Sequence, residues 1–336
     1  MIAYRAPRWL GGNQGLGGNL QTVWPALFAR DHHGAQPRFE RERWTTPDGD
    51  FIDLDWQRLE GVAAPGQCKL LVLFHGLEGS SASPYAQAFA SQARQSGWDF
   101  VVPHFRGCSG ELNHAPRAYH SGDFEEIGWI LSRLRERHPA AAGPMFGVGI
   151  SLGGNALLRW VEEAGLSAAS TLQAAAAVSS PVDLAAGGYA IGSGFNRLVY
   201  TRMFLRSMVP KALAKLAQHP RLFDRERLLA SRSLYDFDNV FTAPLHGFRD
   251  TDDYWTRGSA KPHLPLVRIP TLLLNARNDP FIPAASLPRE HEVGQHVRLW
   301  QPTQGGHVGF PAGLPPGDVL TMPRQVMAWL EAPDLD

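Results

Sequence analysis

Apolar and polar residues alternate near the start of this chain in a pattern typical of a hairpin. Residues 38–45 and 51–57 alternate between apolar and polar side chains, and the turn sequence Thr46-Pro47-Asp48-Gly49-Asp50 separates them. Alternation on both sides of such a turn predicts two antiparallel strands.

From Leu70 onward, short continuous apolar runs alternate with segments of helical periodicity. Strands buried on both faces give continuous apolar runs, and alternation with helices favours a parallel sheet with right-handed crossovers. We therefore expect an α/β fold with a doubly wound, mostly parallel sheet, to which the hairpin adds antiparallel strands. The expected strands are 70–74, 100–103, 145–150, 171–179, 271–275 and 297–300, and the expected core helices are 83–95, 123–136, 155–163 and 324–331.

Two regions depart from this alternation. Residues 1–37 are rich in Gly, Pro and Trp, which predicts an irregular N-terminal arm packed on the core. Residues 184–263 carry helical patterns and no clear strand, which predicts a helical lid inserted into the sheet. The core is then made by residues 38–183 and 264–336.

One segment of the expected lid, residues 194–217, mixes apolar side chains with five Arg and Lys residues. The simpler interpretation is a surface helix with a solvated basic face. A lid that makes transient contact with a membrane is the alternative.

Composition and charge narrow the class of protein. The 336 residues are 44% hydrophobic, which suffices for a sizeable core. The 32 basic residues equal the 32 acidic ones, so no net field favours nucleic acid as a partner. Cys68 and Cys108 are too few for a disulfide framework, and we expect both to be reduced and buried. No signal-like or membrane-spanning apolar stretch is found, so we expect a soluble cytoplasmic protein.

A candidate nucleophile lies between a predicted strand and a predicted helix. Gly149-Ile150-Ser151-Leu152-Gly153 has the form G-x-S-x-G and follows the apolar run 145–150. A serine hydroxyl is a weak nucleophile unless a sharp turn holds it clear of the backbone beside a base. Because serine is also a favoured helix N-cap, the pentapeptide alone is equally compatible with a structural turn.

The serine needs a histidine to accept its proton and an acid to orient that histidine, in the chain order Ser, acid, His. Asp279 follows the strand 271–275, and His307 lies in a glycine-rich loop after the last strand. Asp183, after the preceding strand, is the rival acid, but we favour it as the cap of the first lid helix. The predicted catalytic residues are therefore Ser151, Asp279 and His307.

Negative charge that develops on the substrate oxygen needs preorganised N–H donors. The backbone N–H of Leu152, directly after the serine, is one candidate. The second is the N–H of Leu77, in the loop His75-Gly76-Leu77-Glu78-Gly79 after the first parallel strand. We expect His75 to support this loop rather than to act as a base.

His32 and His33 are adjacent, but no matching cluster of carboxylates or cysteines accompanies them. We interpret them as loop residues, and we expect neither a metal nor a cofactor.

With these residues assigned, the chain resembles the YheT-like branch of the α/β-hydrolase superfamily, which includes bacterial candidate esterases and eukaryotic α/β-hydrolase domain proteins. The resemblance covers nearly the whole chain, and several of its motifs are peculiar to the branch. One departure is Asn19, where relatives often have histidine before Leu-Gln-Thr. The matching segments are Leu20-Gln21-Thr22, 45–50, 75–79, Phe105-Arg106-Gly107-Cys108-Ser109-Gly110-Glu111, 119–123, 149–155, 275–280 and 305–310.

The resemblance implies an α/β-hydrolase fold, with nucleophile, acid and base on Ser151, Asp279 and His307. It also implies carboxylic esters with short or medium acyl chains as substrates, so we expect a serine carboxylesterase that forms an acyl-enzyme. Acyl transfer to an alcohol and hydrolysis of lipids or phospholipids are alternatives, since some eukaryotic relatives catalyse these reactions. A non-catalytic binding scaffold is the alternative outside the enzymes, and the intact candidate residues argue against it.

Overall fold

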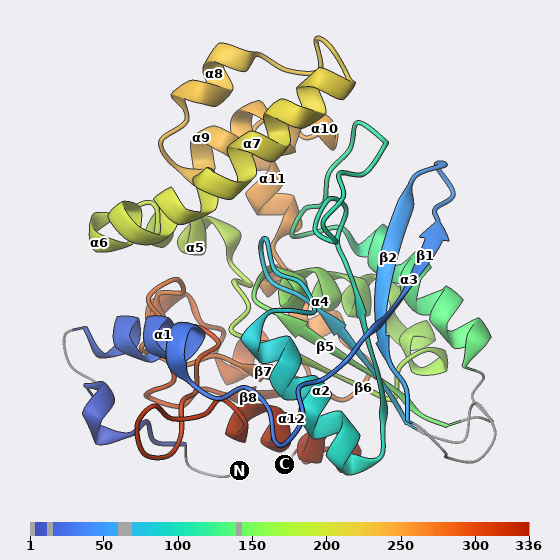
Figure 1. Ribbon diagram of the computed structural model, residues 1–336, viewed down its shortest axis with the longest axis vertical. Coiled ribbons are helices and arrows are strands. Elements are labelled where there is room, and N and C mark those ends of the chain that lie inside the picture. Colours follow the sequence, from blue (N-terminus) through green and yellow to red (C-terminus); the bar gives the residue numbers. More distant parts are fainter. Residues whose placement is uncertain (1–3, 12–15, 60–68, 139–142, 336) are drawn as a thin grey trace.

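The computed structural model describes residues 4–11, 16–59, 69–138 and 143–335, and within them an eight-stranded sheet forms the core (Figure 1). The strand order is β1-β2-β4-β3-β5-β6-β7-β8. β2 is antiparallel to β1 and β4, and all other neighbours from β4 to β8 are parallel. The predicted fold class is confirmed. The strands are β1 (Glu40–Thr45), β2 (Phe51–Gln57), β3 (Leu70–Phe74), β4 (Asp99–Pro103), β5 (Met145–Ile150), β6 (Ala174–Val178), β7 (Thr271–Leu274) and β8 (Val297–Trp300).

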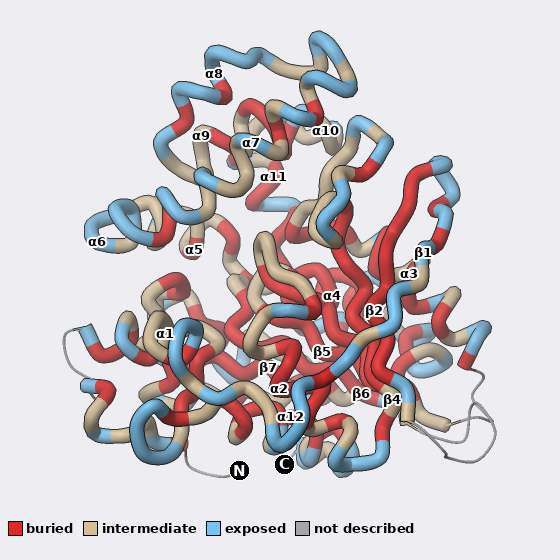
Figure 2. The backbone as a smooth tube through the Cα atoms, in the orientation of Figure 1, coloured by how far each residue is buried: buried red, intermediate tan, exposed pale blue. Residues whose placement is uncertain are grey.

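Helices cover both faces of the sheet because successive side chains of a buried strand point to opposite faces. In β3, Leu71 packs in one apolar cluster with Phe89 of α2, whereas Val72 packs in the other with Leu157 of α4. The residues that define both clusters are buried, and Figure 2 shows the central strands β3, β5 and β6 as buried. The core helices are α2 (Pro84–Ser96) and α12 (Thr321–Glu331) on one face, and α3 (Phe124–Arg137) and α4 (Leu152–Ala164) on the other.

The N-terminal arm is more regular than predicted. Arg8–Leu10 form the 3-10 helix η1, and Gly17–Phe28 form helix α1. The expectation of an irregular arm is therefore wrong for α1, because tertiary contacts offset the low helix propensity of its glycines. Gly18 packs so closely on the loop after β7 that a Cβ would lie 2.0 Å from the Asn278 carbonyl oxygen.

We call residues 184–263 the lid, as proposed from the sequence. Its secondary structure is helical, it lies above the sheet in Figure 1, and it has apolar clusters of its own, one of which includes Leu228 and Phe237. The helix predicted over 194–217 is a continuous run of α6, the π-helical turn η4 and α7. The lid elements are α5 (Leu184–Ile191), α6 (Gly194–Asn196), η4 (Arg197–Thr201), α7 (Arg202–Gln218), α8 (Arg225–Ala230), α9 (Leu234–Val240), α10 (Thr242–Leu245) and α11 (Thr251–Gly258).

No helix in the described part of the chain is long and apolar enough to cross a membrane. Cys108 is a free thiol, as predicted, but it is half-buried rather than buried. Loss of solvation raises its pKa to about 12. Cys68 lies outside the described residues.

Candidate active site

The turn that carries Ser151 is strained and tightly packed. Ser151 joins β5 to α4 with φ 52° and ψ −118°, and L residues rarely adopt such a φ. α4 begins at Leu152, directly after the serine, three residues earlier than predicted. Gly153 lies against the end of β3, where a Cβ would be 2.4 Å from the carbonyl oxygens of Phe74 and His75. This close approach explains why the turn needs glycine there.

The structure brings Asp279 and His307 together with Ser151. His307 Nε2 lies 2.9 Å from Ser151 Oγ, and His307 Nδ1 lies 2.8 Å from Asp279 Oδ2. The Asp279 side chain is fully buried, and its other oxygen accepts the N–H of Phe281 at 2.7 Å. Because an ionised carboxylate can only accept, Nδ1 carries the proton and Nε2 is left to accept the serine O–H. The geometry is that of a general base beside a hydroxyl.

The rival acid, Asp183, has a different partner. It is the N-cap of α5, and its side chain accepts the N–H of Ala186 at 2.9 Å. This is the capping role predicted for it. In the described residues, His307 contacts the carboxylate of Asp279 and not that of Asp183.

Two backbone N–H groups next to Ser151 have no acceptor among the described residues. Leu152 is the first residue of α4, so its N–H has no acceptor within the helix. Leu77 lies in the loop after β3, in which a Cβ on Gly76 would be 3.3 Å from the Ser151 Cβ. The next N–H, that of Glu78, donates to a tyrosine hydroxyl instead. The arrangement offers two free donors for an anion, and the α4 dipole favours it further.

His75 is buried beneath this loop and holds it in place. Its Nε2 accepts the N–H of Phe105 at 3.0 Å, which leaves the Nδ1 proton to bond the Gly76 carbonyl oxygen at 2.8 Å. Burial lowers its pKa to about 3, so the ring is neutral. With both nitrogens engaged, His75 supports the loop, as expected.

Helix α1 contacts the loops that carry Asp279 and His307, which the residue patterns alone did not indicate. The Gln21 Oε1 accepts from the Gly305 N–H and from Asn278 Nδ2, both at 2.9 Å. The Thr22 Oγ1 accepts the N–H of His307 at 2.8 Å. The one available signal was the match of Leu20-Gln21-Thr22 to the family.

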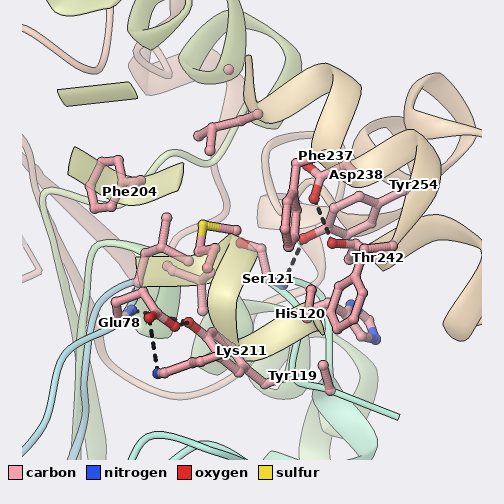
Figure 3. A pocket seen from close by; sticks show the side chains of 18 of the residues that line it. Glu78, Tyr119, His120, Ser121, Phe204, Lys211, Phe237, Asp238, Thr242 and Tyr254 are labelled. Carbon is pink, nitrogen blue, oxygen red and sulfur yellow. Dashed lines mark hydrogen bonds and ion pairs between the residues drawn. The ribbon is translucent and has the colours of Figure 1, made fainter. Parts of the chain in front are cut away.

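A cavity of about 150 Å³ opens beside Ser151 (Figure 3). Its lining is mainly apolar and comes from both the core and the lid, including Phe204 and Met208 of α7, Phe237 of α9 and Phe281 of the core. Such a wall suits an apolar chain attached to the group that reacts at Ser151.

Glu78 links the lid to the loop that carries Leu77. Its carboxylate lies 2.9 Å from Lys211 Nζ of α7 and accepts the O–H of Tyr119 at 2.9 Å (Figure 3). Burial raises the pKa of Tyr119 well above its ordinary value, so the phenol stays protonated and donates. The position of α7 is thereby tied to the backbone donor at Leu77.

A second carboxyl group, Asp238 of α9, lies apart from Glu78 in the pocket wall (Figure 3). It accepts the Thr242 O–H at 2.6 Å and the Trp255 Nε1–H at 3.0 Å. Burial raises its pKa to about 6, although both hydrogen bonds oppose the rise. Asp238 therefore joins three lid helices at the edge of the cavity.

The described residues contain no group of three or more His, Cys, Asp or Glu side chains arranged to hold a metal ion. His32, considered above, pairs with its neighbour Asp31, with Nδ1 2.7 Å from Oδ1.

Comparison with known proteins agrees with the fold. A family model described as the alpha/beta hydrolase fold matches residues 69–313, so the chain belongs to this family. YheT of Escherichia coli (strain K12), a candidate esterase, is 38% identical over 93% of this chain and 89% of its own length, in line with the YheT-like branch. Phospholipase ABHD3 of Mus musculus is 29% identical over 88% of this chain and 72% of its own length. The solved Pyrococcus furiosus esterase Pf2001 shares the fold, with a TM-score of 0.54 and 14% identity over 89% of this chain and 93% of that chain.

Proposed function

We propose that this chain, an esterase- and lipase-like α/β hydrolase, is a serine carboxylesterase for short- to medium-chain esters. The observation that carries the proposal is the continuous row of hydrogen-bonding groups from Asp279 through His307 to Ser151, next to two free N–H donors. The names of the relatives, an esterase and a phospholipase, support an ester or a lipid-like ester as substrate.

Acylation begins when the Ser151 Oγ attacks the ester carbonyl carbon and its proton passes to His307 Nε2. The carbonyl oxygen becomes an oxyanion, which the N–H groups of Leu77 and Leu152 stabilise. Asp279 stabilises the imidazolium and holds its orientation. His307 then gives the proton to the leaving alkoxy oxygen, the C–O bond breaks, and the acyl group remains on Ser151.

Deacylation repeats the sequence with water. His307 Nε2 takes a proton from the water as its oxygen attacks the acyl carbon, and the same two N–H groups hold the second oxyanion. The intermediate collapses, the Ser151 Oγ receives the proton from His307, and the carboxylic acid leaves.

A fluorophosphonate reagent, which modifies activated serines, tests this assignment directly. The wild-type protein should be labelled and should hydrolyse p-nitrophenyl esters, whereas Ser151→Ala should do neither. Ser170→Ala removes an exposed serine that does not line the cavity and should behave as the wild type. Normal turnover by Ser151→Ala would refute the proposal. With the wild-type protein, a series of esters graded by acyl length would define the preferred chain length.

A further inference from the structure

The outer side of the lid presents large apolar side chains to solvent. Phe195, Leu198, Val199 and Met203 are 50%, 57%, 39% and 54% exposed. Their spacing of three to four residues places them along one side of the continuous run α6, η4 and α7. The other side of this run faces the pocket through Phe204.

Helix α1 and its N-cap residue, Leu16, carry a second apolar stripe. Leu16, Leu20 and Leu27 are 59%, 44% and 66% exposed, and spacings of four and seven residues align them on one side of the helix. Tyr200 of η4 donates its O–H to Asn19 at 2.8 Å, so α1 and the lid are in contact. Figure 1 shows α6 above α1, both on the left side of the molecule.

The same two segments concentrate unpaired positive charge. Residues 1–30 and 184–223 contain no Asp or Glu, although the chain has 32 acidic residues. In the lid segment, Arg197, Arg202, Arg206 and Arg221 are exposed. No described residue forms an ion pair with any of these four arginines.

The apolar stripes and the unpaired arginines together indicate what kind of surface could cover the two stripes. Contiguous exposed apolar patches on soluble proteins mark interaction sites. A second copy paired symmetrically would bring the same arginines together and repel. An anionic bilayer satisfies both features, since apolar side chains enter the interfacial layer and arginines bind the phosphates.

We propose that the exposed sides of α1 and of lid residues 195–206 dock together on the surface of an anionic lipid bilayer. We call this surface the docking face. Its lid part lies on the outer side of the run whose last helix, α7, lines the cavity beside Ser151 through Phe204 and Met208, so docking brings the cavity close to molecules held in the bilayer. The proposal concerns membrane association and is independent of the chemistry at Ser151.

Vesicle flotation tests the charge requirement. The wild-type protein should float with vesicles of phosphatidylcholine mixed with phosphatidylglycerol, should not float with phosphatidylcholine alone, and should release in high salt. Arg197→Gln, Arg202→Gln and Arg206→Gln together should weaken binding on the order of a hundredfold, about fivefold for each charge near the surface. Equal binding to both kinds of vesicle would overturn the proposal.

A matched pair of double variants tests the apolar requirement. Leu198→Ser with Met203→Ser should weaken vesicle binding about tenfold or more, while thermal unfolding and hydrolysis of a water-soluble ester stay at wild-type levels. Leu166→Ser with Leu266→Ser, which changes two leucines that are 81% and 48% exposed elsewhere, should bind as the wild type.

Wild-type binding by the Leu198/Met203 variant would refute the docking face, and so would an equal loss of binding in the Leu166/Leu266 control. A third result would also refute it: a wild-type protein that does not bind vesicles but forms a dimer, which the Leu198/Met203 variant does not form. Ser151→Ala should float like the wild type. Its flotation therefore remains informative even if ester hydrolysis fails.

Discussion

Two sets of serine, histidine and aspartate are hydrogen-bonded within the described part of the chain, and they are connected in different orders. At the candidate active site, His307 lies between Ser151 and Asp279. In a second set, where β2 meets β4, the aspartate is central. Ser81 Oγ donates to Asp55 Oδ2 at 2.5 Å, and His104 Nε2 lies 2.8 Å from the same oxygen.

The second set is a buried structural anchor. Ser81 and His104 are 7% and 2% exposed, and Arg41 binds both oxygens of Asp55 at 2.7 and 2.9 Å. Burial alone would raise the pKa of Asp55, but the hydrogen bonds from His104, Arg41 and Ser81 outweigh it and hold this pKa well below the ordinary value. The set ties the N-terminal hairpin to the loops after β3 and β4.

The difference shows that the residue types do not define a catalytic serine. The Ser81 hydroxyl donates to a carboxylate, and no described contact joins it to His104. Ser151 differs because its hydroxyl meets a histidine and it sits on a strained turn, directly before the unpaired N–H of Leu152.

The largest contrast should come from the two histidines. His307→Asn removes the proposed general base, so kcat/KM should fall by a factor on the order of 10^6 while the free energy of unfolding changes little. His104→Asn should lower the free energy of unfolding by about 2 kcal/mol, because it disturbs a buried hydrogen-bonded cluster, and leave kcat/KM nearly unchanged. Ester kinetics and urea titration measure both. An equal catalytic loss in the two variants would remove the distinction between the sets.

The next largest effect on activity should distinguish Asp279 from Asp183, the two candidates for the catalytic acid. Asp279→Asn should reduce kcat by a factor on the order of 10^4, because the amide no longer holds His307 in the required tautomer. Asp183→Asn should be near wild type in both activity and stability, since asparagine caps helices well. The reverse outcome, measured with a short-chain ester, would assign the acid to Asp183.

These contrasts also mark what the sequence could predict. Strands β3, β5 and β8 begin and end where expected, and β3 and β5 do so because each is a continuous apolar run that the sheet buries. The turn at Ser151 and the cap at Asp183 follow from local residue patterns in the same way. Features of this kind can be predicted because they depend on only a few consecutive residues.

Helix α1 and its contacts could not be predicted in this way. Its glycines disfavour a helix locally, and contacts with distant loops, among them the loop at Asn278, compensate. The bonds of Gln21 and Thr22 to the loops of Asp279 and His307, like the Lys211–Glu78 ion pair, join residues far apart in the chain. Such pairings depend on the whole fold, which periodicity does not encode.

Substitution of Asp55, the central residue of the second set, should lower the free energy of unfolding by an amount that depends on pH. The pKa of Asp55 is lower in the folded protein than in the unfolded chain, where it is about 4. Asp55 therefore contributes its full share to the free energy of unfolding above that pH, and this share is lost as the pH falls toward the lower pKa of the folded protein. Asp55→Asn should lower the free energy of unfolding by about 3 kcal/mol near neutral pH and should flatten its acid dependence. Urea titrations over a pH series would reveal this, and an unchanged acid slope would contradict it.

The smallest effect concerns the arm. Thr22→Val removes the acceptor of the His307 N–H, so the loop should place the imidazole less accurately and kcat should fall about tenfold with KM little changed. Thr22→Ser keeps the acceptor and should restore kcat. If the serine variant is as slow as the valine variant, the threonine acts through packing instead.

The hydrogen bond between Thr22 and His307 can form only late in the synthesis of the chain. Its partners are 285 residues apart, and at about 5–20 residues per second a ribosome needs roughly 15–60 seconds to pass from one to the other. During that interval the arm has emerged, but the loop it binds does not yet exist. A nascent chain therefore displays Ser151 well before the histidine that would activate it is made, and hydrolysis starts only when the last part of the chain is complete.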